Sequence, residues 1–256
     1  MNRIKIAAQV QQFERELEFN VNEFSSPESA QVTHSLFVPL HYEKNYAYPL
    51  VIWLHEDGAN ERQLQRVMPF VSMRNYVAVA PVGVESHENG FAWPQTRTVI
   101  ISAETAVTQC ISLAKKRYHI ATDRIFIAGA GAGGTMAFRI GLNHPDLFAG
   151  VLSFAGAMPT DQTPLADFKR CRKVPCFVSH GRESTQFDVD TLCSQLKLMY
   201  AAGFDVTVRQ YPDGDQLNNN VLHDMNVWMM ELVTGQRSDK PNSSSSSVIG
   251  NHWHAN

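Results

Sequence analysis

Short apolar runs alternate along the chain with longer segments in which apolar residues recur three and four positions apart. The short runs are bounded by Gly, Pro, Asp or Asn, as strands usually are, and the longer segments have the period of helices with one buried face. Residues 50–54 read Leu-Val-Ile-Trp-Leu, which is typical of a strand buried on both faces of a sheet. The alternation predicts an α/β fold, a mostly parallel twisted sheet with helices on both faces.

Element positions follow from the same pattern. We expect strands over residues 33–39, 49–55, 76–80, 124–128, 150–154, 174–179 and 206–211. We expect helices over residues 61–74, 101–118, 135–143, 189–202 and 219–233. They predict a single domain over residues 21–235, after an N-terminal arm over residues 1–20. The Ser-rich residues 236–256 are expected to be a disordered tail, in which His252 and His254 flank Trp253 and form at most a weak metal or partner site.

Composition and charge narrow the class of protein. A chain of 256 residues with 44% hydrophobic residues can bury a sizeable core. The 22 Lys and Arg against 25 Asp and Glu give a net charge of −3, which disfavours nucleic-acid binding. We find neither a secretory signal nor an apolar run near the roughly 20 residues of a membrane helix, and therefore expect no membrane partner. The four cysteines lack the spacing of a disulfide framework, so we expect reduced thiols and a soluble, cytoplasmic protein. The sequence has no motif that indicates a metal or an organic cofactor, and we expect neither.

A glycine-dense turn after the fourth expected strand carries the main candidate chemistry. Gly129, Gly131 and Gly134 fit the G-x-G-x-x-G spacing of a dinucleotide-binding turn. That motif normally follows the first strand, however, and needs an acidic residue about 20 positions later, where this chain has Phe-Ala-Gly-Val over residues 148–151. The same segment, Gly-Ala-Gly-Ala-Gly over residues 129–133, fits a nucleophile elbow, G-x-S-x-G, with the serine replaced. Nucleotide binding stays an alternative to the elbow.

Several further motifs accompany this turn, and together they resemble one superfamily. They are Pro49–His55 running into Glu56-Asp57-Gly58, Asn143-His144-Pro145-Asp146, Ser153-Phe154-Ala155-Gly156, Val178-Ser179-His180-Gly181 and Tyr211-Pro212-Asp213-Gly214. Over residues 33–234 the chain resembles the α/β-hydrolase superfamily, within it the small serine esterases of the phospholipase/carboxylesterase and polyhydroxyalkanoate-depolymerase-like type. The resemblance implies an α/β-hydrolase fold and a carboxylesterase-like Ser-His-Asp site.

The positions that the resemblance assigns to the catalytic triad are all substituted. The nucleophile position holds Gly131, the acid position Ser184 and the base position Asp215. In the oxyanion region, around Glu56 and Ala132, a glutamate stands where glycine is expected. Its carboxylate would repel a developing oxyanion. The sequence therefore predicts a hydrolase homologue that is not an enzyme, a scaffold that binds a small molecule or a protein.

Two further groups of residues leave an active enzyme open as an alternative. A displaced nucleophile, Cys176 or Ser153, would act with His180 or His223; we expect the first two in the core and His223 exposed on a helix. Four side chains are candidates for lining a ligand cleft: His55, Phe91, Trp93 and His180.

Overall fold

The computed structural model describes residues 33–87, 89–159, 161 and 168–236. Its elements belong to a compact unit that begins at His34. The strands are β1 (His34–Phe37), β2 (Tyr48–Leu54), β3 (Val77–Pro81), β4 (Glu85–His87), β5 (Gly90–Ala92), β6 (Ile120–Ala130), β7 (Gly150–Phe154), β8 (Cys176–Gly181) and β9 (Val206–Tyr211). The helices are α2 (Gln63–Val71), α3 (Arg97–Arg117), α4 (Ala132–Asn143), α5 (Phe168–Cys171), α6 (Val189–Ala201) and α7 (Asn219–Thr234).

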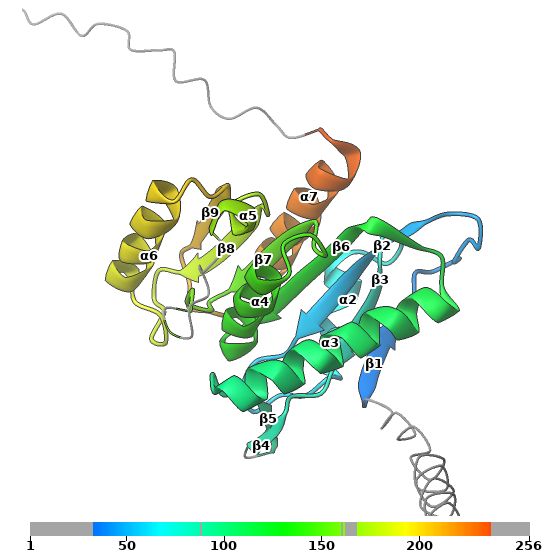
Figure 1. The fold of residues 1–256 in the computed structure, drawn as a ribbon, viewed down its shortest axis with the longest axis horizontal. Coiled ribbons are helices and arrows are strands. Elements are labelled where there is room, and N and C mark those ends of the chain that lie inside the picture. Colours follow the sequence, from blue (N-terminus) through cyan, green and yellow to red (C-terminus); the bar gives the residue numbers. More distant parts are fainter. Residues whose placement is uncertain (1–32, 88, 160, 162–167, 237–256) are drawn as a thin grey trace, which may run out of the picture. The chain divides into compact units, whose positions relative to one another are not determined.

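Seven of the strands form one sheet in the order β1-β3-β2-β6-β7-β8-β9. Every neighbouring pair is parallel except β1 and β3, which are antiparallel. From β2 the chain first adds β3 on one side and later β6 on the other, so the strand order reverses between β2 and β6 (Figure 1). Ligands of open α/β sheets bind at such a switch point, outside the carboxyl ends of the strands.

Helices cover both faces of this sheet, as the sequence predicts. Helices α3 and α4 pack together on one face, and α2 and α7 pack together on the other (Figure 1). The alternation of side chains along β2 explains how one strand serves both faces: Val51 and Trp53 join the core beneath α2 and α7, while Leu50, Ile52 and Leu54 point the other way. All seven residues of β2 are buried, which confirms the prediction for this apolar run.

A row of aromatic rings fixes the core between the sheet and α7. The ring centroids of Trp53 and Phe154 are 5.8 Å apart, those of Phe154 and Phe177 are 5.9 Å apart, and those of Phe177 and Trp228 are 5.7 Å apart. These separations are typical of favourable aromatic contacts. The row ties β2, β7 and β8 to the last helix.

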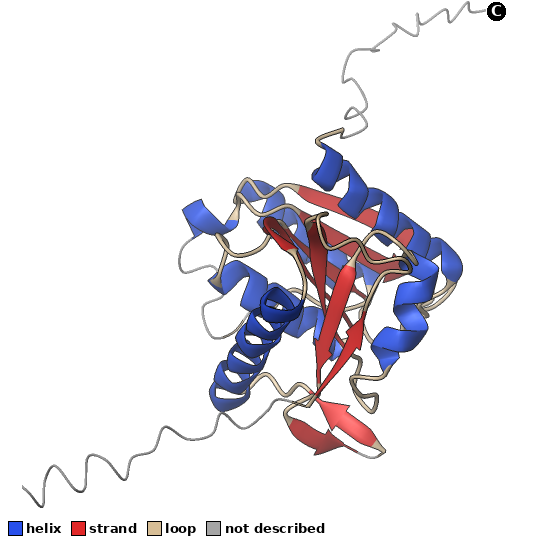
Figure 2. Ribbon diagram, turned by 90° about the vertical axis from the view of Figure 1, so that its right-hand side faces the viewer, coloured by secondary structure: helices blue, strands red, loops and turns tan. Residues whose placement is uncertain are grey.

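Some elements differ from those predicted. The predicted elements include no strand between residues 80 and 124, but Gly90–Ala92 forms β5, which pairs with β4 in a two-stranded sheet at the bottom of the view in Figure 2. Strand β6 begins at Ile120, four residues before its predicted start, and α3 begins at Arg97. Strands of three residues show too little alternation to be detected, and polar Thr122, Asp123 and Arg124 conceal the start of β6.

Other predictions lie outside the described residues. These are the arm over residues 1–20, the first part of the predicted domain over residues 21–32, and His252, Trp253 and His254 in the tail. Among the helices that the structure does describe, none has the length and apolar character needed to span a membrane.

Candidate functional site

The turn between β6 and α4 has the backbone of a nucleophile elbow. Gly131 lies at its centre with φ +52° and ψ −125°, a region that residues with a side chain rarely occupy. Its N–H donates to the carbonyl of Phe154 at 2.9 Å, and its own carbonyl accepts from the N–H groups of Gly134 and Thr135 at 2.9 and 3.1 Å. Both peptide groups of Gly131 are therefore held by hydrogen bonds.

The space above Gly131 is open. A Cβ added at this residue would meet, within 4 Å among the described residues, only Gln186 Oε1 at 3.7 Å and Glu56 Cβ at 3.8 Å. Both are ordinary van der Waals contacts. A side chain at this position would thus project into a space bordered by the loops that follow β2 and β8.

Close packing explains why the neighbouring positions of the turn are also glycine. A Cβ at Gly133 would lie 2.3 Å from the carbonyl oxygen of His55, one at Gly129 would lie 2.4 Å from the backbone of Gly133, and one at Gly134 would lie 2.6 Å from Ser153 Oγ. Only glycine lets α4 approach the strands this closely. Packing therefore accounts for three glycines of the turn without a bound nucleotide.

The residues at the acid and base positions lie in contact. Ser184 follows β8 and Asp215 follows β9, and Ser184 Oγ donates to Asp215 Oδ2 at 2.5 Å. Ser184 Oγ also accepts from the Phe187 N–H at 3.0 Å, while Asp215 Oδ1 accepts from the Gly181 N–H at 3.4 Å. The fold thus brings these two positions together, as the resemblance implies for an acid and its histidine.

Glu56 is oriented by a chain of hydrogen bonds from the core. Trp53 Nε1 donates to Gln63 Oε1 at 2.9 Å, and Gln63 Nε2 donates to Glu56 Oε1 at 2.8 Å. Trp53 is fully buried and Gln63 is 4% exposed, whereas Glu56 itself is exposed. An indole nitrogen can only donate, so the Gln63 oxygen must face Trp53 and its NH₂ group must face an acceptor. Glu56, in the loop next to the elbow, is this acceptor.

His55 has a structural role. Its ring is fully buried, Nδ1 donates to the Glu56 carbonyl at 2.8 Å, and Nε2 accepts from the Gly83 N–H at 2.9 Å. Burial lowers the pKa of His55, against a smaller opposing effect of the Glu56 carbonyl and of the Glu61 and Asp57 charges. His55 is thus held as a neutral ring with both nitrogens occupied.

The other residues predicted to line a cleft are mostly covered. Trp93 is 1% exposed and donates from Nε1 to the His55 carbonyl at 2.9 Å. His180 is 1% exposed and donates from Nε2 to the Phe187 carbonyl at 2.7 Å, and among the described residues its Nδ1 has no partner. Phe91, on β5, is half-buried. A ligand reaches His55, Trp93 and His180 only if the loops above them move, so a cleft lined by these residues stays a prediction.

The candidate replacement nucleophiles lie in the core, as predicted. Ser153 is fully buried and its hydroxyl donates to the Gly156 carbonyl at 2.8 Å. Cys176 is also fully buried, and burial raises the pKa of its thiol to about 12. His223, as predicted, is exposed on α7. Neither Ser153 nor Cys176 presents an accessible nucleophile.

Sequence reasoning missed two residues of the site, Gln63 and Gln186. The only signal for Gln63 is a polar residue at the start of a helix near a buried tryptophan, and such a tryptophan needs an acceptor for its N–H group. Gln186 comes close to Gly131 through the course of the loop after β8, which has no periodic pattern.

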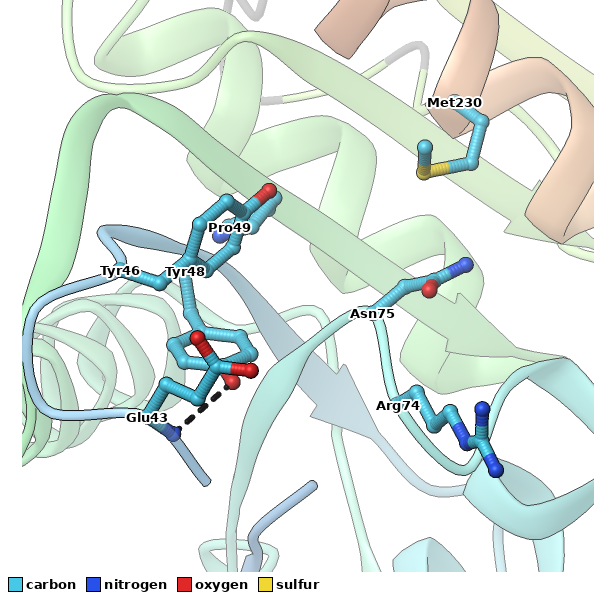
Figure 3. Close-up of a pocket in the computed structure, with 7 residues that line it drawn as sticks. All are labelled: Glu43, Tyr46, Tyr48, Pro49, Arg74, Asn75 and Met230. Carbon is cyan, nitrogen blue, oxygen red and sulfur yellow. Dashed lines mark hydrogen bonds between the residues drawn. The ribbon is translucent and has the colours of Figure 1, made fainter. Parts of the chain in front are cut away.

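A pocket of about 190 Å³ lies elsewhere in the molecule (Figure 3). Tyr48 opens β2 and Asn75 precedes β3, so the pocket lies at the amino ends of these strands, at the opposite edge from Glu56. Its lining residues are Glu43, Tyr46, Tyr48, Pro49, Arg74, Asn75 and Met230. It is therefore separate from the elbow.

Metal-ligating side chains do not cluster in the part of the chain that the structure describes. No three His, Cys, Asp or Glu side chains there are placed to hold a metal ion together.

Sequence comparisons connect this geometry with known proteins. A family model described as Phospholipase/Carboxylesterase matches residues 43–231. The curated protein named "Putative esterase NocK", from Nocardia uniformis subsp. tsuyamanensis, is 26% identical over 141 residues, which cover 52% of this chain and 39% of that protein. The chain thus spans about two fifths of the length of this relative.

Solved structures of esterases share the fold. The Bacillus cereus carboxylesterase has a TM-score of 0.65 and 16% identity, over 80% of this chain and 96% of that chain. The Mesorhizobium loti carboxylesterase has a TM-score of 0.62 and 18% identity, over 72% and 90% of the two chains. The Zea mays acyl-protein thioesterase 2 has a TM-score of 0.60 and 16% identity, over 79% and 99%. At these identities the similarity establishes the α/β-hydrolase fold and leaves the chemistry to the site itself.

Proposed function

The chain belongs to the phospholipase/carboxylesterase family, and we propose that it is a catalytically degenerate member that binds a small molecule or a protein partner at the former active site. The observation that carries this proposal is Gly131. The elbow keeps its positive φ and an open space above its centre, yet the residue there has no side chain to attack an acyl group. The geometry that presents a nucleophile is kept without the nucleophile.

The contact between Ser184 and Asp215 supports the proposal. In a working triad, a carboxylate orients a histidine, and the histidine removes the proton of the nucleophile. Here the hydroxyl of Ser184 donates to Asp215. The pair contains no imidazole that could act as a base, and the elbow holds Gly131 in place of a serine that a base could activate. Without a triad, only the roughly 10³–10⁴-fold acceleration from an oxyanion hole and substrate binding would remain.

Glu56 should reduce this residual acceleration further. Its Cβ lies 3.8 Å from the position that a Cβ on Gly131 would occupy, so the loop bordering the space above the elbow carries a carboxylate in place of the expected glycine. A negative charge near a developing oxyanion destabilises the transition state, whereas an oxyanion hole must stabilise it. We therefore expect ester turnover near the uncatalysed rate.

The test is turnover of short-chain p-nitrophenyl esters between about pH 6 and about pH 9, the range over which a catalytic histidine changes its protonation state. A heat-denatured sample and a blank are the controls. We expect rates equal to both. Saturable turnover well above them would overturn the proposal in favour of an active esterase with a displaced nucleophile.

Restoring the triad sharpens this test. The triple variant Gly131→Ser, Ser184→Asp and Asp215→His should gain measurable ester cleavage, because the acid and base positions already lie in hydrogen-bond contact. The matched control is Gly131→Ala with the same two changes, which has a Cβ at the elbow but no nucleophile. Equal activity in the two triple variants would refute the role given to residue 131. A thermal shift with nucleotides would instead support nucleotide binding by the turn.

We also propose a cytoplasmic location. Cys110, Cys176 and Cys193 are free thiols, which is typical of proteins kept in a reducing compartment. Cell fractionation tests this, and recovery with secreted proteins would contradict it.

A further inference from the structure

Helix α6 carries an apolar stripe on its outer surface. Val189, Cys193, Leu196 and Tyr200 follow one another at steps of four, three and four residues. Since an α-helix turns by about 100° per residue, these steps place the four side chains within about 60° of one another, over a length of about 17 Å. We call these four residues the α6 stripe.

The α6 stripe is largely open to solvent. Its end residues, Val189 and Tyr200, are 47% and 61% exposed, and Cys193 is also exposed. The side chains that α6 buries, Leu192 and Met199, lie about a quarter of a turn away from the stripe. Figure 1 shows α6 at the outer end of the sheet, beyond β8 and the edge strand β9. A contiguous exposed apolar surface of this kind indicates contact with another molecule.

Two charged residues accompany the stripe on one side. Asp190 and Lys197 are seven residues apart, so they lie on the same side of α6, about 10 Å apart along its axis. Ion pairs within a helix join residues three or four positions apart, which excludes a pair between these two. Both are exposed, and within the described part of the chain neither belongs to an ion pair. Both charges are therefore available to a partner.

We propose that the α6 stripe docks on the α6 stripe of a second copy of this chain, with the two helices antiparallel about a twofold axis. The axis passes through the middle of the stripe, between Cys193 and Leu196. Val189 then lies opposite Tyr200 of the second copy, and Cys193 lies opposite Leu196 of the second copy. A smaller side chain thus faces a larger one at every level of the contact, which is how apolar surfaces interlock. Twofold dimers are also the commonest protein assemblies.

The charges select the second copy as the partner and the antiparallel direction. In an antiparallel pair, Asp190 of each copy lies beside Lys197 of the other, so the contact contains two ion pairs of opposite charge. A parallel pair would place Asp190 against Asp190 and Lys197 against Lys197, which repel each other. The surface of α6 is therefore complementary to itself in one direction only.

The experiment measures the mass of the full-length protein by sedimentation velocity as its concentration is raised. Two helices of 13 residues bury less than the roughly 1,200–2,000 Å² of a standard stable interface, so we expect a weak dimer, with a Kd between about 10 µM and about 1 mM. Labelling of Cys193 by a thiol reagent should slow over the same concentrations, because the contact covers it. A monomer throughout this range would overturn the proposal.

Tyr200→Glu and Leu198→Glu form a matched pair of variants. Leu198 is 48% exposed and lies almost half a turn away from the α6 stripe on the same helix. Both residues are well exposed, so both variants should fold. Tyr200→Glu places a carboxylate in the apolar contact and should raise the dimer Kd about tenfold or more, whereas Leu198→Glu should leave it unchanged. Equal Kd values in the two variants would refute the assignment of the surface.

Charge reversals test the pairing itself. Asp190→Lys and Lys197→Asp each turn two attractive pairs into repulsive ones, so each variant alone should have a Kd raised about tenfold. An equimolar mixture of the two variants, and the double variant on its own, should associate as the unmodified protein does, because opposite charges meet again. An unchanged Kd in both single variants, or a mixture that stays monomeric while circular dichroism shows both variants folded, would refute the antiparallel contact.

Discussion

Replacing Gly131 by serine tests whether the elbow stores backbone strain. A residue with a side chain at φ +52° and ψ −125° is strained, and such strain costs about 1–3 kcal/mol. Sterically the change is mild, because the new Cβ would meet its nearest neighbours at 3.7 and 3.8 Å. For a domain of this size, about 2–4 °C in Tm per kcal/mol converts this cost into a fall of about 2–12 °C.

Gly129→Ser is the matched comparison, since it adds the same side chain two residues earlier. There the Cβ would lie 2.4 Å from the backbone of Gly133, which cannot move without displacing α4 from the sheet. We expect Gly129→Ser to cost more than Gly131→Ser and to approach loss of folding. Urea unfolding followed by tryptophan fluorescence measures both free energies of unfolding. The reasoning fails if Gly131→Ser lies within about 0.5 kcal/mol of the unmodified protein, the range of neutral surface changes, or if the two variants are equally stable.

Three further predictions follow from single residues. With a thiol reagent near neutral pH, the exposed Cys193 should react in the native protein. Cys176 is buried and its pKa is raised to about 12, so it should react only after unfolding. Fast labelling of Cys176 in the native protein would contradict its place in the core. Because burial lowers the pKa of His55, the unfolded chain takes up that proton first, so stability should be full above the unfolded value of 6.5 and fall as the pH drops below it. Urea midpoints above and below this pH should differ less in His55→Gln than in the unmodified protein. Asn218 caps α7 by accepting from the N–H of Val221, so Asn218→Ala should cost about 1 kcal/mol and Asn218→Gly only a few tenths, as thermal unfolding would show.

The sheet was largely predictable because its central strands are buried on both faces. A strand such as β2 must be apolar at every position, and a run of this kind stands out between polar turns. The observed bounds of β7 and β9 coincide with the predicted residues 150–154 and 206–211. Burial on both faces thus explains why β7 could be predicted to the residue, whereas β9, an edge strand with one buried residue, was predictable from Asp205 and Pro212, which bound it.

The site was predictable only where topology alone places residues together. The loops after β8 and β9 leave neighbouring parallel strands at the same edge, so contact between Ser184 and Asp215 follows from the order of elements. The link between Trp53, Gln63 and Glu56 depends instead on how α2 sits on the sheet, and the approach of Gln186 depends on a loop without periodicity. Neither leaves a local pattern in the sequence.

The persistence of the elbow in a chain with glycine at its centre indicates what determines its shape. The N–H of Gly131 is held by Phe154, and its carbonyl is held by two amides of α4 and approached so closely by Gly156 that a Cβ there would lie 2.5 Å away. These contacts with β7 and α4 fix the peptide groups on both sides of residue 131 whether or not a side chain is present. Serine at this position therefore bears a strain that the surrounding packing imposes, and glycine adopts the same backbone without it. On the proposed function, loss of the nucleophile left the fold intact and removed strain in one step, which explains how esterase geometry and absence of ester chemistry occur in one chain.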